Sequence, residues 1–341
     1  MLRAFITGIT GQDGSYLAEW LLSQGYEVHG LVRRSSPLSR SRLEHLYRDP
    51  AVHGKRLFFH HAELDDAIGL RRVLAKVEPV EIYHLAGQSH VGLSFEIPEA
   101  TCAVTALGTL RLLELARDLR PIPKFFNASS SEIFGEPTQV PQDEQTPLAP
   151  VNPYGCARAF ATQMTAVYRR SFGLFACNGI LFNHESPRRG EGFVTKKICA
   201  AAAAIRLGLQ KELVLGDVKA ERDWGHAQDY VRGMWLTLQH EKADDYVFAT
   251  GQVHSVQEAV EHAFATVQLD WTQYIRSDPS LMRPTEPRRL VGNPAKAKRI
   301  LRWEPRISFQ ELIAEMTKAE LAALSTRGEV YRDEIVKLPR N

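Results

Sequence analysis

The chain has 341 residues, of which 44% are hydrophobic and 24% are charged, so it can bury one large core or two smaller ones. Its formal net charge of +2 is too small to indicate a nucleic-acid partner. The sequence leads directly into a glycine-rich segment and has no apolar run of membrane-spanning length, so we expect a cytoplasmic protein with no membrane partner.

Short apolar segments alternate with segments of helical periodicity through the first half of the chain. The apolar segments predict strands at 4–6, 27–32, 57–60, 81–85, 124–128 and 176–181. Helical periodicity predicts helices at 16–23, 67–76, 103–117 and 154–171. This alternation indicates an α/β protein built on a doubly wound parallel sheet, the Rossmann fold.

After about residue 188 the pattern changes. It predicts an alanine-rich helix at 195–207, a short strand at 213–215, a helix at 229–239 and loops rich in Pro and Arg at 281–293. We therefore expect a dinucleotide-binding domain over residues 1–188, with some exchange of strand and helix across the boundary. A smaller substrate-binding domain is expected over residues 189–341.

Four cysteines are scattered along the chain, at Cys102, Cys156, Cys177 and Cys199. They lack the short spacings of metal sites and redox motifs. We expect reduced, mostly buried thiols, with no disulfide and no zinc site.

A glycine-rich loop connects the first predicted strand to the first helix, with the sequence Thr7-Gly8-Ile9-Thr10-Gly11-Gln12-Asp13-Gly14. Backbone N–H groups and the helix dipole at such a turn face a pyrophosphate, and the missing side chains allow it to approach closely. Spaced glycines also occur in purely structural turns, but the strand and helix on either side favour a bound dinucleotide.

Basic and hydroxyl side chains follow the second predicted strand, where a carboxylate would bind the ribose of NAD. They are Arg33, Arg34, Ser35 and Ser36. Guanidinium groups at this position favour the 2′-phosphate of NADP. The alternative is an exposed basic turn.

Tyr154 and Arg158 lie four residues apart at the start of a predicted helix, after Asn152-Pro153, so both project from one face. A tyrosine phenol has an ordinary pKa of about 10 and takes up a proton near neutral pH only if a cation stabilises the phenolate. Arg supplies this charge, but its planar fork cannot take the position of a Lys on a ribose hydroxyl or pass on a proton. The alternative is an ordinary pair on a surface helix.

Hydroxyl groups and one carboxylate follow the strand at 124–128, among them Ser130 and Glu132. Open parallel sheets build their sites at the carboxyl ends of strands, so these two residues are candidates for the reaction. Three serines without this context would suggest a loop or a helix cap.

With these motifs the sequence resembles the extended short-chain dehydrogenase/reductases, and specifically the GDP-mannose 4,6-dehydratases. Matching segments extend from residues 6–17 to residues 303–305. The run at 179–190, Gly-Ile-Leu-Phe-Asn-His-Glu-Ser-Pro-Arg-Arg-Gly, is far more specific than a glycine loop. The resemblance implies a Rossmann fold, NADP as cofactor and a GDP-sugar as substrate, either GDP-mannose or a close relative.

The resemblance also implies the reaction. Tyr154 would take the proton of the C4 hydroxyl while hydride passes from C4 to NADP, and Ser130 would hydrogen-bond that hydroxyl. Glu132 would then remove the C5 proton, water would leave from C6, and the hydride would return to C6. Arg158 stands where the family has a lysine beside the tyrosine.

By the same matching, the residues that hold NADP would be Gly8, Thr10, Gly11, Gln12, Asp13, Gly14, Arg33, Arg34, Ser35, Ser36, Glu63, Leu64, Leu85, Ala86, Gly87, Gln88, Ser89, Tyr154, Arg158, His184 and Arg189. Those that hold the GDP-sugar would be Ser89, His90, Ser130, Glu132, Asn183, Lys197, Arg222, Arg283 and Glu286.

The chain departs from the family pattern near the cofactor. Besides Arg158, Glu63 stands for an Asp and Ala100 for a Tyr, and the segment between residues 271 and 283 is shorter. The segment 34–42 matches a loop that reaches a neighbouring subunit in this family, so we expect a homodimer or homotetramer. Two alternatives stay open: a GDP-sugar 4-oxidoreductase or epimerase in which Glu132 is vestigial, and a weakly active pseudoenzyme limited by Arg158.

Overall fold

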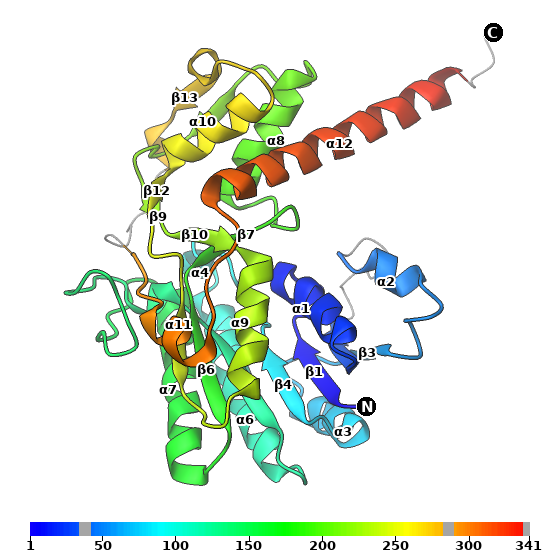
Figure 1. Cartoon of the computed structure of the whole chain (residues 1–341), viewed down its shortest axis with the longest axis vertical. Coiled ribbons are helices and arrows are strands. Elements are labelled where there is room, and N and C mark those ends of the chain that lie inside the picture. The colour runs from blue at the N-terminus through cyan, green and yellow to red at the C-terminus, as the bar shows by residue number, and fades with distance from the viewer. Residues whose placement is uncertain (34–41, 282–289, 337–341) are drawn as a thin grey trace.

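The computed structural model of the chain describes residues 1–33, 42–281 and 290–336, although not the side chains of residues 281 and 327–336. Its centre is a seven-stranded sheet with the strand order β11-β6-β5-β4-β1-β2-β3 (Figure 1). The strands are β1 (Arg3–Thr7), β2 (Glu27–Val32), β3 (Leu57–His61), β4 (Glu81–His84), β5 (Lys124–Ser130), β6 (Ala176–Leu181) and β11 (Asp245–Phe248).

All neighbouring strands of this sheet pair in parallel. The order reverses at β1, because β2 pairs with one edge of β1 and β4 with the other. Such a switch point opens a crevice at the carboxyl ends of the strands, where open α/β sheets bind their ligands. The predicted Rossmann fold is confirmed.

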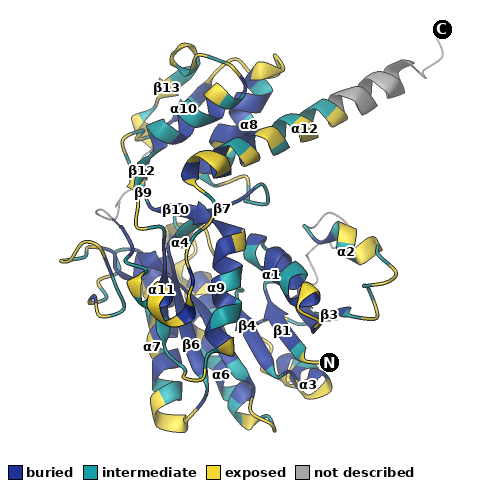
Figure 2. Cartoon of the chain, viewed as in Figure 1, coloured by how far each residue is buried: buried dark blue, intermediate teal, exposed yellow. Residues whose placement is uncertain are grey.

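Helices cover both faces of the sheet. Successive residues of a strand point to opposite faces, and here both faces carry apolar side chains. Ala4 and Ile6 point toward α1 (Gln12–Ser23), α9 (Ala227–Gln239) and α11 (Ala295–Leu301). Phe5, between them, points toward α3 (Ala67–Val77), α6 (Gly108–Asp118) and α7 (Pro153–Phe172). The strands are accordingly buried apart from the edge strand β3, and exposed residues lie on the outer sides of the helices (Figure 2).

A second, smaller group of elements has its own core, which includes Ile198, Trp224, Phe264 and Ile313. It contains α8 (Val194–Arg206), α10 (Val256–Thr266), the first half of α12 (Phe309–Val336), and the parallel pair β8 (Leu213–Leu215) and β13 (Ile275–Ser277). The far half of α12 projects from the body of the molecule (Figure 1). Two further short pairs are β7 (Asn183–Glu185) with β10 (Trp224–His226), and β9 (Glu221–Arg222) with β12 (His254–Ser255).

Short helices complete the described chain. These are α2 (Glu44–Arg48), α4 (Leu93–Glu96), α5 (Pro98–Cys102), η3 (Ser131–Ile133), η4 (Trp271–Gln273) and η5 (Pro279–Leu281). The helix predicted at 103–117 begins as a π-helical segment, η2 (Ala103–Leu107), before it continues as α6. In the described part of the chain, no helix combines the length and apolar character needed to cross a bilayer.

The expectation of mostly buried thiols is wrong for two of the four cysteines. Cys177 and Cys199 are buried, but Cys102 and Cys156 are exposed. Cys156 lies on α7 two residues after Tyr154 and two before Arg158, both of which are buried. Residues two apart on a helix do not share a face, so the cysteine points outward.

Candidate active site

The glycine loop lies at the switch point of the sheet, between β1 and α1. Gly8 has a φ of +76°, and a Cβ there would lie 2.8 Å from the backbone nitrogen of Ala86. A Cβ at Gly14 would overlap the Gly8 carbonyl oxygen and lie 2.5 Å from Cα of Ile9. Both positions therefore require glycine for the loop to close against its neighbours.

Helix α1 begins without a capping side chain, since Gly11 is its N-cap residue. The N–H groups of a first helical turn need acceptors, and the helix dipole favours an anion there. Three guanidinium groups also gather near this turn. Arg42 donates to the carbonyls of Thr10 (3.2 Å) and Arg188, and its pKa is lowered by burial and by the charges of Arg189 and Arg188. The uncapped turn and this cationic surrounding fit the pyrophosphate of a dinucleotide.

Tyr154 and Arg158 meet on the buried face of α7, with 8% and 4% of their surfaces exposed. Nε of Arg158 donates to the Tyr154 hydroxyl at 3.2 Å, and Nη1 donates to the Ala128 carbonyl at 2.6 Å. The guanidinium thereby holds α7 against the end of β5 and presents a permanent charge to the phenolic oxygen. A Cβ at Gly87 would lie 2.9 Å from Nη2, so the loop after β4 also packs against the guanidinium.

Glu132 lies in the η3 turn that follows β5, and it is 8% exposed. Its Oε2 accepts a hydrogen bond from Nδ2 of Asn152 at 2.8 Å. The hydroxyl oxygen of Ser130 accepts the Glu132 backbone N–H at 3.3 Å, which places Ser130 at the start of the same turn. Ser130, Glu132, Tyr154 and Arg158 thus come from β5, the turn after it and the first two turns of α7.

A buried polar chain lies beneath the glycine loop, and our sequence analysis did not identify it. Thr109 donates its hydroxyl hydrogen to the Thr105 carbonyl at 2.7 Å, so its oxygen must accept from Nε2 of His84 at 3.0 Å. Nδ1 of His84 then accepts from the Thr7 hydroxyl at 2.7 Å. Burial and the nearby Arg158 charge lower the pKa of His84 to about 3, consistent with this neutral tautomer. The signal available in the sequence was a histidine, His84, within the strand predicted at 81–85.

His184 and Asp13 form a buried pair that joins β7 to the start of α1. Nε2 of His184 lies 2.8 Å from Oδ2 of Asp13. Burial would lower the pKa of His184 and raise that of Asp13, but their mutual attraction prevails and shifts both pKa values the other way. Gln12 strengthens the connection, because its Nε2 donates to the His184 carbonyl at 3.0 Å and its Oε1 accepts from Ser186 at 2.8 Å.

Two arginines of the 179–190 run lie beside the same helix. Arg188 donates to the Ser15 hydroxyl at 3.1 Å and forms a 2.6 Å ion pair with Glu19. The guanidinium carbon of Arg189 lies 3.5 Å from the ring centroid of Phe193, and its Nε lies 2.9 Å from Oε2 of Glu185. The resemblance named Arg189 and passed over Arg188, whose contacts to α1 only the folded chain reveals.

The remaining predicted cofactor residues that the structure describes lie just after the carboxyl ends of β2, β3 and β4. Leu64 is buried after the end of β3, and Glu63 beside it is exposed. Gln88, after β4, donates from Nε2 to the His90 carbonyl at 2.9 Å, while Ser89 and His90 are exposed. Arg33 is exposed at the end of β2. Residues outside the described part of the chain are Arg34, Ser35, Ser36, Arg283 and Glu286.

The predicted sugar-nucleotide residues that are described are more dispersed. Asn183 is half-buried in β7, and Arg222 is half-buried in β9, where its Nη1 donates to the Glu221 carbonyl at 2.7 Å. Lys197 is exposed on α8 and donates to the Val214 carbonyl at 2.7 Å. Asp223, which the sequence analysis did not single out, holds the loop beside Arg222: its carboxylate accepts N–H groups from Thr250, Gly251 and Gly292.

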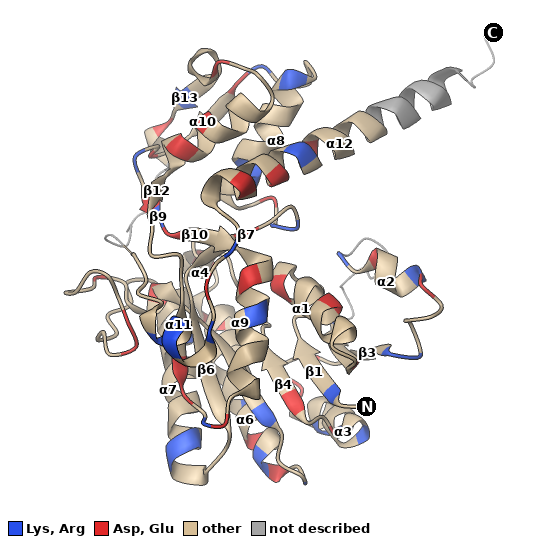
Figure 3. Ribbon diagram, viewed as in Figure 1, with Lys and Arg blue, Asp and Glu red and all other residues tan. Residues whose placement is uncertain are grey.

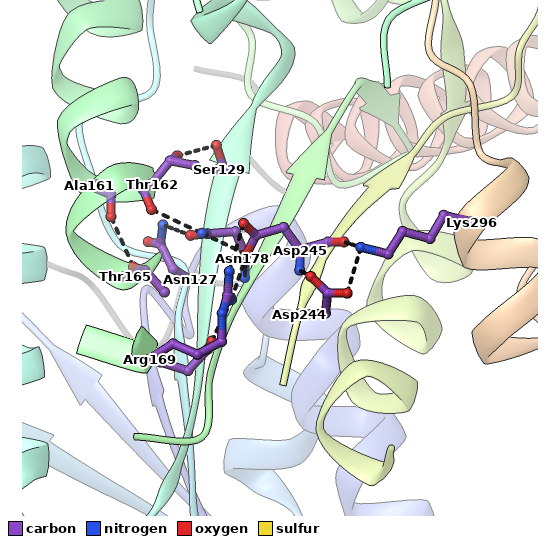
Figure 4. A network of polar contacts seen from close by, with 11 residues as sticks. Asn127, Ser129, Ala161, Thr162, Thr165, Arg169, Asn178, Asp244, Asp245 and Lys296 are labelled. Carbon is purple, nitrogen blue, oxygen red and sulfur yellow. Dashed lines mark hydrogen bonds and ion pairs between the residues drawn. The ribbon is translucent and has the colours of Figure 1, made fainter. Parts of the chain in front are cut away.

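A cavity of about 440 Å³ lies beside the second half of α7 and the start of β11, and its lining includes Ile133 and Phe134, directly after Glu132. Figure 4 shows the polar network in its wall, where Arg169 binds both carboxylate oxygens of Asp245 at 2.8 and 3.0 Å. Nδ2 of Asn178 donates to the same carboxylate at 2.9 Å, and Lys296 pairs with Asp244 at 2.7 Å. Basic residues also collect at this C-terminal end of α7 (Figure 3), as the helix dipole favours. The network ties β6, β11, α7 and α11 together.

Comparison with known proteins agrees with this geometry. Residues 5–316 match the family model described as GDP-mannose 4,6 dehydratase. The chain is 50% identical over 335 residues to GDP-mannose 4,6 dehydratase 1 of Arabidopsis thaliana, covering 97% of this chain and 92% of that protein. It is 46% identical over 343 residues to the GDP-mannose 4,6 dehydratase of Homo sapiens, covering 95% and 92%.

Among solved structures, the dTDP-glucose 4,6-dehydratase DesIV of Streptomyces venezuelae, with NAD and TYD bound, superposes with a TM-score of 0.83 at 25% identity. The superposition covers 96% of this chain and 98% of that one. The chain belongs to the GDP-mannose 4,6-dehydratase family.

Proposed function

We propose that this protein is an NADP-dependent enzyme that converts GDP-mannose, or a close GDP-sugar, to the GDP-4-dehydro-6-deoxy sugar. The observation that carries the proposal is the hydrogen bond from Nε of Arg158 to the Tyr154 hydroxyl. Through this bond Arg158 supplies the cation that a proton-accepting tyrosine needs. An arginine at this position had raised the alternative of a weakly active pseudoenzyme.

In the proposed reaction, NADP held at the glycine loop would supply the hydride chemistry, which is oxidation at C4 of the sugar followed by reduction at C6. Tyr154 takes the proton of the C4 hydroxyl, with Arg158 stabilising the phenolate and Ser130 orienting the hydroxyl. Oxidation at C4 acidifies the C5 hydrogen, so one carboxylate is sufficient for the elimination. Glu132 takes the C5 proton and passes it to the C6 hydroxyl, which leaves as water. Reduction at C6 then leaves an enolate, and C5 regains a proton from the active site, which balances the proton that Tyr154 took from the C4 hydroxyl.

The choice of NADP over NAD rests on the chain between β2 and α2. The residue that follows β2 is Arg33, where a carboxylate would bind the ribose of NAD. We propose that Arg33, with Arg34, Ser35 and Ser36, binds the 2′-phosphate of NADP. Asn183 is proposed to bind the GDP-sugar together with Lys197, Arg222, Arg283 and Glu286, which belong to a second domain that begins near residue 189. A homodimer or homotetramer in the cytoplasm remains part of the proposal.

The test is a reaction of the purified protein with GDP-mannose and either NADP or NAD, followed by mass spectrometry. We expect a product lighter by one water, formed more readily with NADP. Glu132→Gln is the control variant: it should reduce water loss to a small residual rate while the protein stays folded. Unchanged product formation by Glu132→Gln would refute the dehydratase mechanism and favour the oxidoreductase alternative.

A further inference from the structure

The side chain of Asn152 connects the two halves of the active site. It is 4% exposed and stands directly before Pro153, the first residue of α7. Its Oδ1 accepts the Gly155 backbone N–H at 2.7 Å, and its Nδ2 donates to Oε2 of Glu132 at 2.8 Å. One planar amide therefore holds the first turn of the helix that carries Tyr154 and, at the same time, the carboxylate of Glu132.

The two partners fix the orientation of this amide. A backbone N–H requires an acceptor and a carboxylate requires a donor, so the oxygen faces Gly155 and the nitrogen faces Glu132. Serine and aspartate cap helices about as well as asparagine. Aspartate offers no donor to a second carboxylate, however, and serine is too short to offer the same reach. Helix capping alone does not explain why an asparagine stands here.

Backbone packing provides a second link between the same two segments. A Cβ at Gly155 would lie 2.6 Å from the carbonyl oxygen of Glu132, so the first turn of α7 touches the η3 turn directly. Within the described part of the chain, Asn152 is the only hydrogen-bond partner of the Glu132 carboxylate, and it binds Oε2 alone. One carboxylate oxygen is anchored, and the other is left for a substrate proton.

We propose that Asn152 is a positioning residue for the elimination and acts through Glu132. Its amide aims the carboxylate so that Oε1 meets the C5 hydrogen of a sugar whose C4 hydroxyl lies at Tyr154. Oε1 takes the C5 proton, the electron pair of the C5–H bond forms the C5–C6 double bond, and the C6–O bond breaks as the proton passes to the leaving hydroxyl. The inference rests on the proposed function, since Glu132 must be the base.

Asn152→Ser separates this role from helix capping, because serine keeps an acceptor for Gly155 and removes the amide donor to Glu132. We expect thermal unfolding close to that of the wild type and a KM for GDP-mannose within about twofold. Turnover should fall by about 10- to 100-fold, the range for losing a hydrogen bond to a charged group. Oxidation at C4 does not use Glu132, so a larger share of the bound nicotinamide should be reduced at steady state, which absorbance reports.

Asn152→Asp is the second variant, since it keeps the cap and places a like charge against Glu132. Its turnover should fall at least as far as that of Asn152→Ser. Adding Asn152→Ser to Glu132→Gln should leave the residual turnover of Glu132→Gln unchanged, because the carboxylate through which Asn152 acts has been removed.

Wild-type turnover in both Asn152 variants, with unchanged nicotinamide absorbance, would overturn the proposal. A loss that adds fully to that of Glu132→Gln would overturn it as well. Failure of the proposed function is distinguishable from either result, because the wild-type protein with GDP-mannose and NADP would then give no product lighter by one water.

Discussion

Replacement of Arg158 by methionine tests whether its charge acts on Tyr154. Methionine is apolar and flexible enough to fill the buried space, so the main losses are the bond to the Tyr154 hydroxyl (3.2 Å) and the bond to the Ala128 carbonyl (2.6 Å). A unit charge 3.2 Å from a phenolate is worth about 5 kcal/mol at an effective dielectric of 20, before the cost of desolvation. A net value of about 1.5–3 kcal/mol is typical of hydrogen bonds to charged groups.

We therefore expect Arg158→Met to lower turnover by about 10- to 100-fold, since 1.4 kcal/mol corresponds to a factor of ten. The assay is steady-state formation of the dehydrated product, with thermal unfolding and cofactor binding measured on the same samples. Arg158→Lys keeps the charge but reaches fewer acceptors, so it should stay within about tenfold of the wild type. Wild-type turnover in a folded Arg158→Met variant would refute the role assigned to the guanidinium.

Three further outcomes follow from the glycine loop, the His184–Asp13 pair and the buried carboxylate of Asp223. Gly14→Ala should destabilise the protein by about 1–3 kcal/mol, measured by urea unfolding, because its Cβ would meet backbone atoms 2.5 Å away that cannot yield. The His184–Asp13 pair should stabilise the fold most between the two ordinary pKa values. The pKa of His184 is raised, so its contribution is complete below about pH 6.5 and is lost as pH rises through the folded value. The pKa of Asp13 is lowered, so its contribution is complete above about pH 3.8 and is lost as pH falls through the folded value. His184→Gln should flatten the alkaline loss in unfolding curves, and an unchanged curve would contradict this assignment. Asp223→Asn should cost about 1–3 kcal/mol for each backbone donor left without an acceptor, and it should raise the KM for GDP-mannose more than it lowers turnover.

The parallel sheet was predictable because its strands are short apolar runs between helical segments. The segments 27–32 and 176–181 were predicted with the bounds that β2 and β6 have. Strand β11 was missed because its four residues, Asp245–Phe248, follow a charged turn and carry no alternation long enough to stand out. Only tertiary pairing with β6 makes this segment a strand, and local sequence does not record that pairing.

The contacts of the active site also differ in how far the sequence predicts them. Tyr154 and Arg158 are four residues apart, so helical geometry alone predicts their contact. Glu132 and Asn152 are twenty residues apart with no regular element spanning the interval, and their hydrogen bond depends on how the η3 turn packs on α7. His84 and Thr109 come from different elements as well. Spacing within one element reveals a pair, whereas a pair across two elements becomes visible only when the chain is folded.

Gly87 offers a test of how the chain accommodates an arginine at this position. Its backbone lies outside the left-handed region, so alanine is tolerated by conformation, but a Cβ would lie 2.9 Å from Nη2 of Arg158 and 3.2 Å from Oγ1 of Thr105. The guanidinium cannot withdraw freely, because Nη1 is bonded to Ala128 and the side chain is buried. Gly87→Ala should therefore slow the wild-type enzyme by about tenfold through displacement of Nε from Tyr154. A lysine has no Nη2 to displace, so the same substitution should cost less in an Arg158→Lys background. The double-mutant cycle on turnover measures this coupling. Strictly additive losses would mean that the position of the Arg158 guanidinium does not depend on having glycine at residue 87.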